Sequence, residues 1–253
     1  MSLGPPGSVF AALLALSLLL AGGALPAAHA ATVEARVKYI SSSKKDMPPN
    51  ASNVVIWLTP LSPQAAPEAE ATLAKARRHF QLVQSHKRFD PHLLVVPVGS
   101  LVDFPNRDPF FHNVFSLFDG KRFDLGLYEA GSTRSVRFDR AGVSFIFCNI
   151  HPQMSAVVVV LKTPYYGVTG DSGAVKILNV PDGRYRVNMW SERALPQTLK
   201  TLVREVTVGG NNSSSLGLIQ MKASGDLLAD HKNKYDRDYE PANSSSSPYE
   251  QLK

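Results

Sequence analysis

Short runs of β-branched and aromatic residues, separated by turn residues, recur along most of this chain. The region from His79 to Lys162 contains these runs: Leu93–Val96, Ser100–Phe104, Val114–Phe118, Ser135–Phe138, Val143–Phe147 and Ala156–Lys162. Segments such as Pro97-Val98-Gly99 and Asp119-Gly120 lie between them and carry residues that favour turns. Many short strands with this punctuation predict an all-β fold of the β-sandwich type.

The chain on either side of this region carries further strand patterns. Thr32–Ile40 and Asn53–Leu58 flank a polar loop near the N-terminus, and more strand patterns follow in the range Tyr165–Val208. Pro63–Lys75 is rich in Ala, Glu and Pro, and its pattern fits either a short helix or a linker. Beyond about Gln220 the chain is polar, so we expect a flexible, disordered tail without a packed core of its own.

The N-terminal residues have the pattern of a secretory signal peptide. An unbroken run of apolar and small residues, Phe10–Leu20, precedes Ala28-His29-Ala30, which has the A-x-A form of a cleavage site. The run is short for a membrane span of about 20 residues, so cleavage is favoured over the alternative of an uncleaved anchor. We therefore expect a mature chain that begins at Ala31, has no transmembrane segment and is exported to the periplasm or the extracellular space.

Cysteine usage and charge exclude several classes of protein. A single cysteine among 253 residues excludes a disulfide scaffold, a Cys-rich zinc site, an iron–sulfur cluster and a covalently attached c-type haem. The formal net charge is +6, but no dense run of Lys and Arg occurs, so nucleic acid is not an expected partner. The single thiol, Cys148, therefore needs its own explanation.

The segment Cys148–Met154 places a thiol, an imidazole and a thioether on one short loop, directly after the apolar run Val143–Phe147. Taken alone, a buried Cys is most often a small hydrophobic residue, and a lone His or Met usually has an equally ordinary structural role. Two His, one Cys and a weak axial Met, however, form the ligand set that selects copper for one-electron transfer. His112, which follows a turn and begins an apolar run, is the candidate for the second histidine.

The order of these motifs resembles that of a known family. Asn106-Arg107-Asp108, then His112-Asn113-Val114, then a Cys-x2-His-x2-Met loop occur within the range Pro91–Leu161. Over this range the chain closely resembles the small blue copper proteins (cupredoxins) of the amicyanin and plastocyanin type, which implies a Greek-key β-sandwich. The chain departs from the family in a longer insertion, Leu117–Gly131, and in extra chain on both sides.

The resemblance also implies a ligand set. One type 1 copper ion would have His112, Cys148 and His151 as equatorial ligands and Met154 as the axial ligand. Asn113 would take the family's supporting role and tie the two ligand loops together through hydrogen bonds.

A second, weaker resemblance concerns the flanking strands. Asp171-Ser172-Gly173 and Val180-Pro181-Asp182-Gly183-Arg184-Tyr185, each followed by a strand pattern, resemble the prealbumin-like module of carboxypeptidase regulatory domains. The alternative is two domains in tandem, with the N-terminal strands as a hairpin on the first. We favour an inserted arrangement, which is tolerated where domain termini lie close together. Its divisions are a signal peptide at 1–30, a discontinuous prealbumin-like β-sandwich at 31–61 and 164–216, a cupredoxin domain at 79–162, and a flexible polar tail at 217–253.

These features predict an exported one-electron carrier with transient redox partners, and not an enzyme. The sequence has no His-x-His pair to hold the trinuclear centre of a multicopper oxidase and no second cysteine for a binuclear copper centre. No oxyanion hole or orienting carboxylate can be identified for a Cys148–His151 nucleophilic pair. Two other functions stay open: copper handling by a periplasmic chaperone or storage protein, and a structural or adhesion module with a vestigial copper site.

Overall fold

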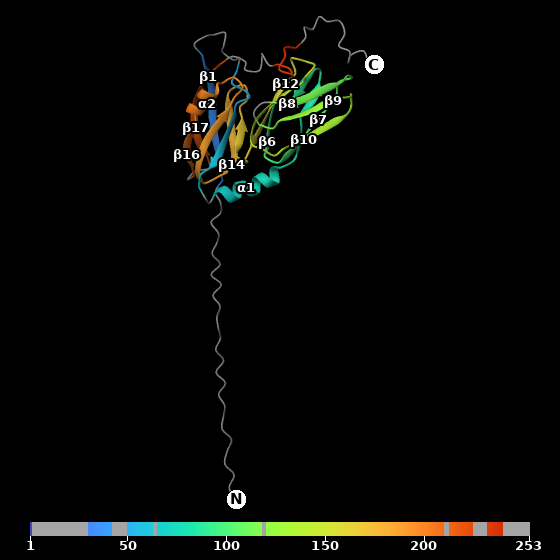
Figure 1. Cartoon of the computed structure of the whole chain (residues 1–253). Helices are drawn as coiled ribbons and strands as arrows, with labels where there is room; N and C mark the ends of the chain where they lie inside the picture. Colours follow the sequence, from blue (N-terminus) through green and yellow to red (C-terminus); the bar gives the residue numbers. More distant parts are fainter. Residues whose placement is uncertain are drawn as a thin grey trace.

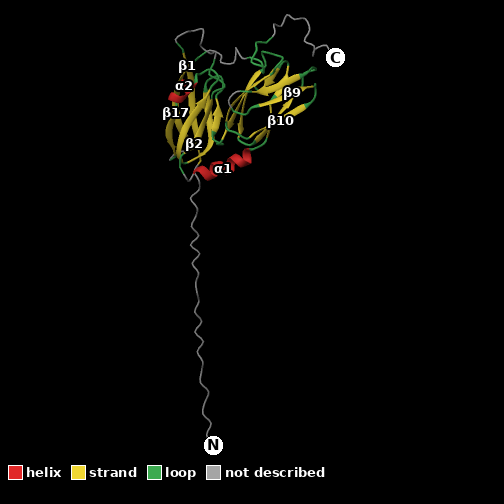
Figure 2. Ribbon diagram, viewed as in Figure 1, coloured by secondary structure: helices red, strands yellow, loops and turns green. Residues whose placement is uncertain are grey.

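The computed structural model describes residues 1, 30–41, 50–62, 65–117, 120–209, 213–224 and 232–239, which form two β-sandwiches side by side (Figure 1, Figure 2). Strands make up most of the described secondary structure, so the fold is all-β, as predicted. Residues 2–29, and with them almost all of the expected signal peptide, lie outside the described residues. Neither described helix has the length and the apolar run that crossing a bilayer requires.

The first sandwich is formed by strands from the middle of the chain. One sheet has the strand order β6, β12, β11, β8, β9, with bounds Leu93–Pro97, Ser155–Leu161, Gly142–Phe147, His112–Ser116 and Phe123–Tyr128. The other has the order β10 (Thr133–Phe138), β7 (Ser100–Pro105), β3 (His79–Gln81), and the hairpin of β4 (Val83–Ser85) and β5 (Arg88–Asp90) contacts β7. Phe104 and Phe138 from the second sheet belong to the same buried core as Val114 and Ile146 from the first.

Strand β9 lies where the sequence indicated only an insertion. It forms the edge of the five-stranded sheet and pairs antiparallel with β8, so that His112 lies opposite Tyr128. The register shifts between Asn113 and Phe115, and Gly126 has a φ of 65°. Phe123, Leu125 and Leu127 alternate with Asp124 and Gly126, so this segment has the period of two of a strand, which the sequence analysis did not use.

The second sandwich takes its strands from both ends of the chain. One sheet has the order β14 (Ala174–Pro181), β1 (Ala30–Ile40), β17 (Ser213–Lys222). The other has the order β13 (Tyr166–Val168), β2 (Val55–Pro60), β15 (Gly183–Trp190), β16 (Arg204–Val208), and the short helix α2 (Pro196–Thr201) connects β15 to β16. The chain therefore leaves this sandwich after β2 and returns to it at β13.

Strand β17 continues past the point where the polar tail was expected to begin. It runs parallel to β1 as far as Lys222, and buried Ile219 and Met221 alternate with exposed Gln220 and Lys222. The alternation of Ile219 and Met221 with Gln220 and Lys222 is that of a half-buried edge strand, and the pairing with β1 confirms it. Residues 217–222 therefore belong to the sandwich and not to a tail.

The Ala- and Glu-rich segment after β2 is a helix. Helix α1 (Ala65–Ala76) begins within the stretch for which a helix and a linker were both considered. It lies across the end where the two sandwiches meet and contacts both β2 and β6 (Figure 1). Ala69 and Leu73, four residues apart, are its buried side chains, so one helical face covers this junction.

The sequence of β12 explains how the two sandwiches are joined. Successive residues of a strand point to opposite faces of the sheet. Val158 faces the core of the first sandwich, whereas its neighbours Val157 and Val159 face a second buried cluster that is shared with the other sandwich. The continuous apolar run of β12 is therefore that of a strand buried on both faces.

The shared cluster draws on both sandwiches. Phe115 and Phe147 from the first sandwich are buried in it, together with Val55 from the second. At its border the rings of Phe145 and Trp190 lie 6.4 Å apart. The outer face of the five-stranded sheet is thus covered by protein, which fixes the position of the strand that carries the cysteine.

Val55→Ala tests how strongly the shared cluster stabilises the protein. Val55 has no exposed surface, so the loss of two methyl groups and the resulting cavity should lower the free energy of unfolding by about 2 kcal/mol. Urea unfolding followed by circular dichroism measures this change. Val168→Ala, at a position with 39% of its surface exposed, is the matched control and should change the same quantity by less than about 0.5 kcal/mol. Equal effects of the two substitutions would contradict the prediction.

Candidate metal centre

Strand pairing brings the two histidine- and cysteine-bearing segments to one end of the five-stranded sheet. β8 begins at His112, and β11 ends at Phe147, directly before Cys148. The two strands are antiparallel neighbours, with Phe147 opposite Phe115. The start of one strand therefore lies beside the end of the other, although 36 residues separate the two side chains in sequence.

Three of the four candidate ligands converge. The Cys148 Sγ atom lies 3.7 Å from Nδ1 of His112 and 3.6 Å from Nδ1 of His151. Among the described residues these three form the one group of His, Cys, Asp or Glu whose donor atoms could share a metal ion, all within 4.8 Å of one another. Met154 has no exposed surface and belongs to the same buried core as Cys148.

The loop that carries Cys148, His151 and Met154 is closed by its own main chain. The N–H of Met154 donates to the carbonyl of His151 at 3.0 Å, and the N–H of Cys148 donates to the carbonyl of Met154 at 3.2 Å. These two hydrogen bonds fold the loop so that the Cys-x2-His-x2-Met spacing becomes a compact turn. The loop therefore holds its own conformation before any metal binds.

Burial favours the neutral Cys148 thiol, whereas hydrogen bonds from the main chain favour its thiolate. Burial raises the pKa of the Cys148 thiol, while backbone N–H groups of Asn113, Ile150 and His151 hydrogen-bond the sulfur and oppose that rise. A metal ion would replace the thiol proton, because the thiolate is the form that binds metal.

Asp108 orients His112, a role that the sequence analysis missed. Its carboxylate lies 2.8 Å from Nε2 of His112, which leaves Nδ1 on the side of the sulfur. The backbone N–H groups of His86 and Lys87 donate to the same carboxylate at 2.6 and 2.9 Å. Burial works to raise the pKa of Asp108, but the bonds from His112 and from these two N–H groups lower it overall. A carboxylate that holds a metal-facing imidazole in this way fixes both its ring orientation and its tautomer.

The turn that holds Asp108 also has an unusual backbone. His86 and Lys87, which join β4 to β5, both adopt left-handed conformations, with φ of 54° and 55°. This conformation aims two successive N–H groups at one carboxylate. The sequence signal that could have found Asp108 is its position four residues before His112.

An aromatic side chain covers the imidazoles. The Phe110 ring centroid lies 5.2 Å from that of His112 and 5.6 Å from that of His151. His112 has no exposed surface and His151 retains 9%. Water is therefore largely excluded from the cluster, and His151 is its one partly exposed member.

Asn113 contacts the cysteine through its main chain and not through its side chain. Its side-chain amide donates to Asp124 of β9 at 2.8 Å and not to the loop that carries the cysteine. The link between the two loops runs instead through its backbone N–H, which bonds the Cys148 sulfur. The shifted register of β8 on β9 places Asp124 where it captures the side chain.

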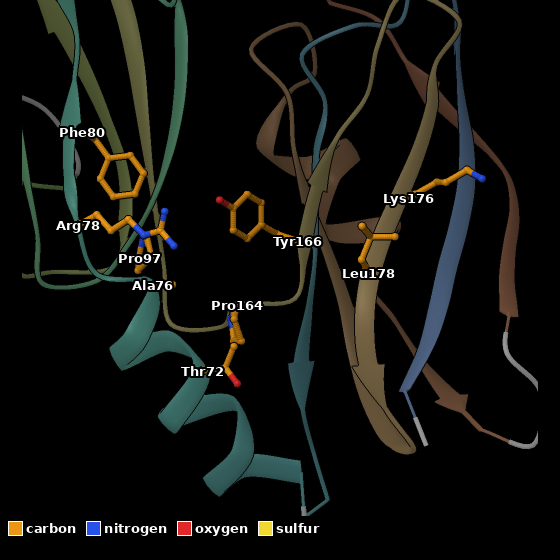
Figure 3. Close-up of a pocket in the computed structure, with 9 residues that line it drawn as sticks. All are labelled: Thr72, Ala76, Arg78, Phe80, Pro97, Pro164, Tyr166, Lys176 and Leu178. Carbon is orange, nitrogen blue, oxygen red and sulfur yellow. The ribbon is translucent and has the colours of Figure 1, made fainter. Parts of the chain in front are cut away.

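A groove of about 500 Å³ lies at the opposite end of β12 from the cluster (Figure 3). It is bordered by Pro97, which pairs with the last residue of β12. In Figure 3 the Tyr166 hydroxyl points to the side of the groove that carries Arg78 and Phe80. The described lining contains no His, Cys, Asp or Glu. The candidate metal site is therefore the cluster of His112, Cys148 and His151 and not this groove.

The donor set of the cluster fits a copper ion. In zinc sites the metal lies about 2.3 Å from a cysteine sulfur and about 2.0 Å from an imidazole nitrogen. A metal ion with these bond lengths fits between the Cys148 sulfur and the Nδ1 atoms that lie 3.6 and 3.7 Å from it. The angle at the metal between sulfur and nitrogen would be about 115°. Hard cations such as Ca²⁺ and Mg²⁺ take oxygen ligands. A thiol, two imidazoles and a buried thioether are instead the soft and borderline donors that suit copper.

Comparison with known proteins finds partial similarities to copper proteins. No protein-family model matches the chain, and no curated protein matches it. Among solved structures, a purple cupredoxin from Nitrosopumilus maritimus is 26% identical, with 32% of this chain and 99% of that chain covered and a TM-score of 0.30. A reduced amicyanin variant is 26% identical over 42% of this chain and 99% of that one, with a TM-score of 0.31.

A copper-containing nitrite reductase from Thermus scotoductus SA-01 is 24% identical over 32% of this chain, with a TM-score of 0.31. This chain spans 22% of the reductase. With TM-scores this low, the assignment of the site depends on its own residues and geometry.

The stability of the metal-free protein should fall as the pH falls below about 6.5, the unfolded value for histidine. Burial lowers the pKa of His112, and the neighbouring Asp108 only partly opposes this. The unfolded chain therefore binds a proton on this ring before the folded chain does, and the loss is at most about 1.4 kcal/mol per pH unit. Urea unfolding of the metal-free protein from pH 7 to pH 5 measures the slope.

His112→Gln removes this titrating ring and should flatten the slope. His79→Gln is the control, since the His79 side chain is 71% exposed, and it should keep the wild-type slope. A slope that is equally steep in His112→Gln would contradict the prediction.

Proposed function

We propose that this protein is an exported type 1 copper protein that carries one electron between redox partners. One copper ion would be held by His112, Cys148 and His151, with Met154 as a weak fourth ligand. The observation that supports this most directly is the convergence of one sulfur and two Nδ1 atoms at 3.6 to 3.7 Å in a buried site. Two imidazoles and one thiolate with a weak axial Met form the set that tunes copper for electron transfer.

Bound copper would supply a one-electron redox couple. The chain's own residues would keep the ligand positions the same in both oxidation states. The closed ligand loop fixes Cys148 and His151 relative to each other, and Asp108 prevents the His112 ring from turning. Phe110 excludes water from the two imidazoles. Because the ligands are held in place and water is excluded, few atoms would have to move when an electron enters or leaves.

The partner would be a redox protein that docks transiently at the loop end of the first sandwich. The second sandwich covers the outer face of the β11–β12 sheet, so that face is not accessible. Pro152 and Gln153 are exposed beside His151, which is the one partly exposed member of the cluster. Electron carriers of this kind bind through small, weak interfaces. We propose neither a nucleic-acid partner nor an enzymatic reaction for this chain.

The strand pairing supports a division into two domains. We propose a cupredoxin domain over residues 79–162, inserted into a prealbumin-like β-sandwich whose first part is residues 31–61. The second part begins near residue 164 and includes β17. Export by cleavage of a signal peptide near Ala30 completes the proposal, and it places the site in the periplasm or outside the cell.

Cys148→Ser should abolish the intense visible band that the wild-type protein shows when loaded with Cu(II). The band arises from charge transfer between a thiolate and copper, and serine has no sulfur to supply it. Absorption spectroscopy with metal analysis of the purified protein measures both band and metal content. Val143→Ala is the control and should keep the band, because Val143 lies in β11, which precedes Cys148, but is not one of the proposed ligands. A copper-loaded wild type without colour would contradict the proposal.

Electron transfer and copper handling differ in what happens to the metal. The loaded protein should pass through repeated cycles of reduction by ascorbate and oxidation by ferricyanide without losing copper, because His112 and Cys148 are fully buried. Copper content after each cycle, in the presence of a Cu(I) chelator, checks this. Release of the metal to the chelator within the first cycles would instead support a role as copper chaperone or store.

A further inference from the structure

A C-terminal segment crosses the metal-ligand loop. We call residues 232–239 the strap; Figure 1 draws it in red at the loop end of the first sandwich. The Tyr239 hydroxyl donates to the carbonyl oxygen of Cys148 at 2.8 Å. The backbone N–H of Lys234 donates to the side-chain oxygen of Asn149 at 3.0 Å. The strap thus bonds the residue that supplies the sulfur and the residue that follows it.

Lys234 also reaches the strand that supports the other ligand segment. Its ammonium group lies 2.8 Å from Oδ2 of Asp124 on β9. The other oxygen of that carboxylate accepts the side-chain amide of Asn113, directly after His112, at 2.8 Å. One lysine therefore connects the cysteine loop, through its main chain, with the His112 strand, through its side chain.

The ion pair that anchors the strap is better shielded than a typical surface pair. The side chains of Lys234 and Asp124 are 19% and 35% exposed. Lys232 and Asp236, which pair within the strap, are 51% and 89% exposed. Shielding from solvent strengthens an ion pair relative to one in open water, so the contact to β9 is the stronger of the two.

The strap has a defined conformation of its own. The side-chain oxygen of Asn233 accepts the N–H groups of Tyr235 and Arg237 at 2.9 and 3.2 Å. The N–H of Asp236 donates to the carbonyl of Asn233 at 3.0 Å. This turn presents Lys234 and Tyr239 together to the first sandwich, which lowers the entropy cost of their contacts.

We infer that Lys234 and Tyr239 are positioning residues of the copper site, which hold the main chain of the cysteine loop against β9. They act through the Cys148 carbonyl, Asn149 and Asp124. The inference rests on the proposed function, since the loop is positioned for a copper ion. Outer partners of a metal site affect how tightly and in which geometry the ligands bind.

Tyr239→Phe removes the hydroxyl that bonds the loop and keeps the ring. In the copper-loaded protein it should accelerate copper loss to a chelator about fivefold, the effect of one hydrogen bond, and shift the visible band. Tyr185→Phe is the matched control, because the Tyr185 hydroxyl also donates to a main-chain carbonyl, that of Pro181 at 2.8 Å, but in the second sandwich. It should leave both the rate and the band unchanged.

Lys234→Met and Lys232→Met form a second matched pair. Each removes one ammonium group from the strap, but only Lys234 bonds β9. Lys234→Met should accelerate copper loss, whereas Lys232→Met should match the wild type. Amide hydrogen exchange of residues 149–151 in the metal-free protein supplies a readout that needs no copper, and it should be faster in Tyr239→Phe and Lys234→Met than in their controls.

The two readouts separate this inference from the proposed function. A wild type that forms no coloured copper site, combined with faster loop exchange in Tyr239→Phe and Lys234→Met, would overturn the proposed function while supporting the strap as the support of the loop. Variants that match their controls in loop exchange would overturn the inference. So would unchanged copper loss and an unchanged band in a coloured protein, even where loop exchange is faster.

Discussion

The approach of one thiol sulfur to two imidazole nitrogens, in a place from which water is largely excluded, is the constraint around which the first sandwich is arranged. Burial raises the pKa of Cys148 and lowers that of His112, so both groups are driven toward their neutral forms. Buried polar groups are costly unless they are paired. A soft metal ion would bind all three donors at once, which gives this otherwise unfavourable burial a physical reason.

The geometry around these donors is set in layers. The antiparallel pairing of β8 with β11 brings His112 and Cys148 to one end of the sheet. Asp108 then fixes the His112 ring, and its own position depends on two N–H groups of a left-handed turn in a separate hairpin. Segments that lie far apart in sequence therefore set different parts of the geometry of the same site: the strand pairing sets the distance between His112 and Cys148, and Asp108 sets the orientation of the His112 ring.

The second sandwich contributes to the site without touching it. It covers the outer face of the five-stranded sheet, and β12 is buried on both faces as a result. A strand packed on both sides moves little, because close-packed interiors transmit displacement instead of absorbing it. The same cover leaves the ligand loop, where Pro152 and Gln153 are exposed beside His151, as the part of the centre nearest to solvent. Rigidity and access thus come from the same arrangement.

The sequence alone determined the features that depend on local pattern. Strand runs and turn residues predicted an all-β fold. The spacing from Cys148 to Met154 indicated a candidate ligand loop, since closing it needs only neighbouring residues. Other features needed the tertiary structure. The sequence places Asp108 four residues before His112, but only the tertiary structure shows that a distant hairpin holds its carboxylate. The Asn113 side chain bonds Asp124 because β9 pairs with a shifted register. Strand β17 was placed partly in the tail because its apolar alternation covers few residues, and only its pairing with β1 sets its length. A local sequence pattern can indicate a strand, but it does not specify which distant segment that strand will contact. Those contacts are therefore decided by the tertiary structure.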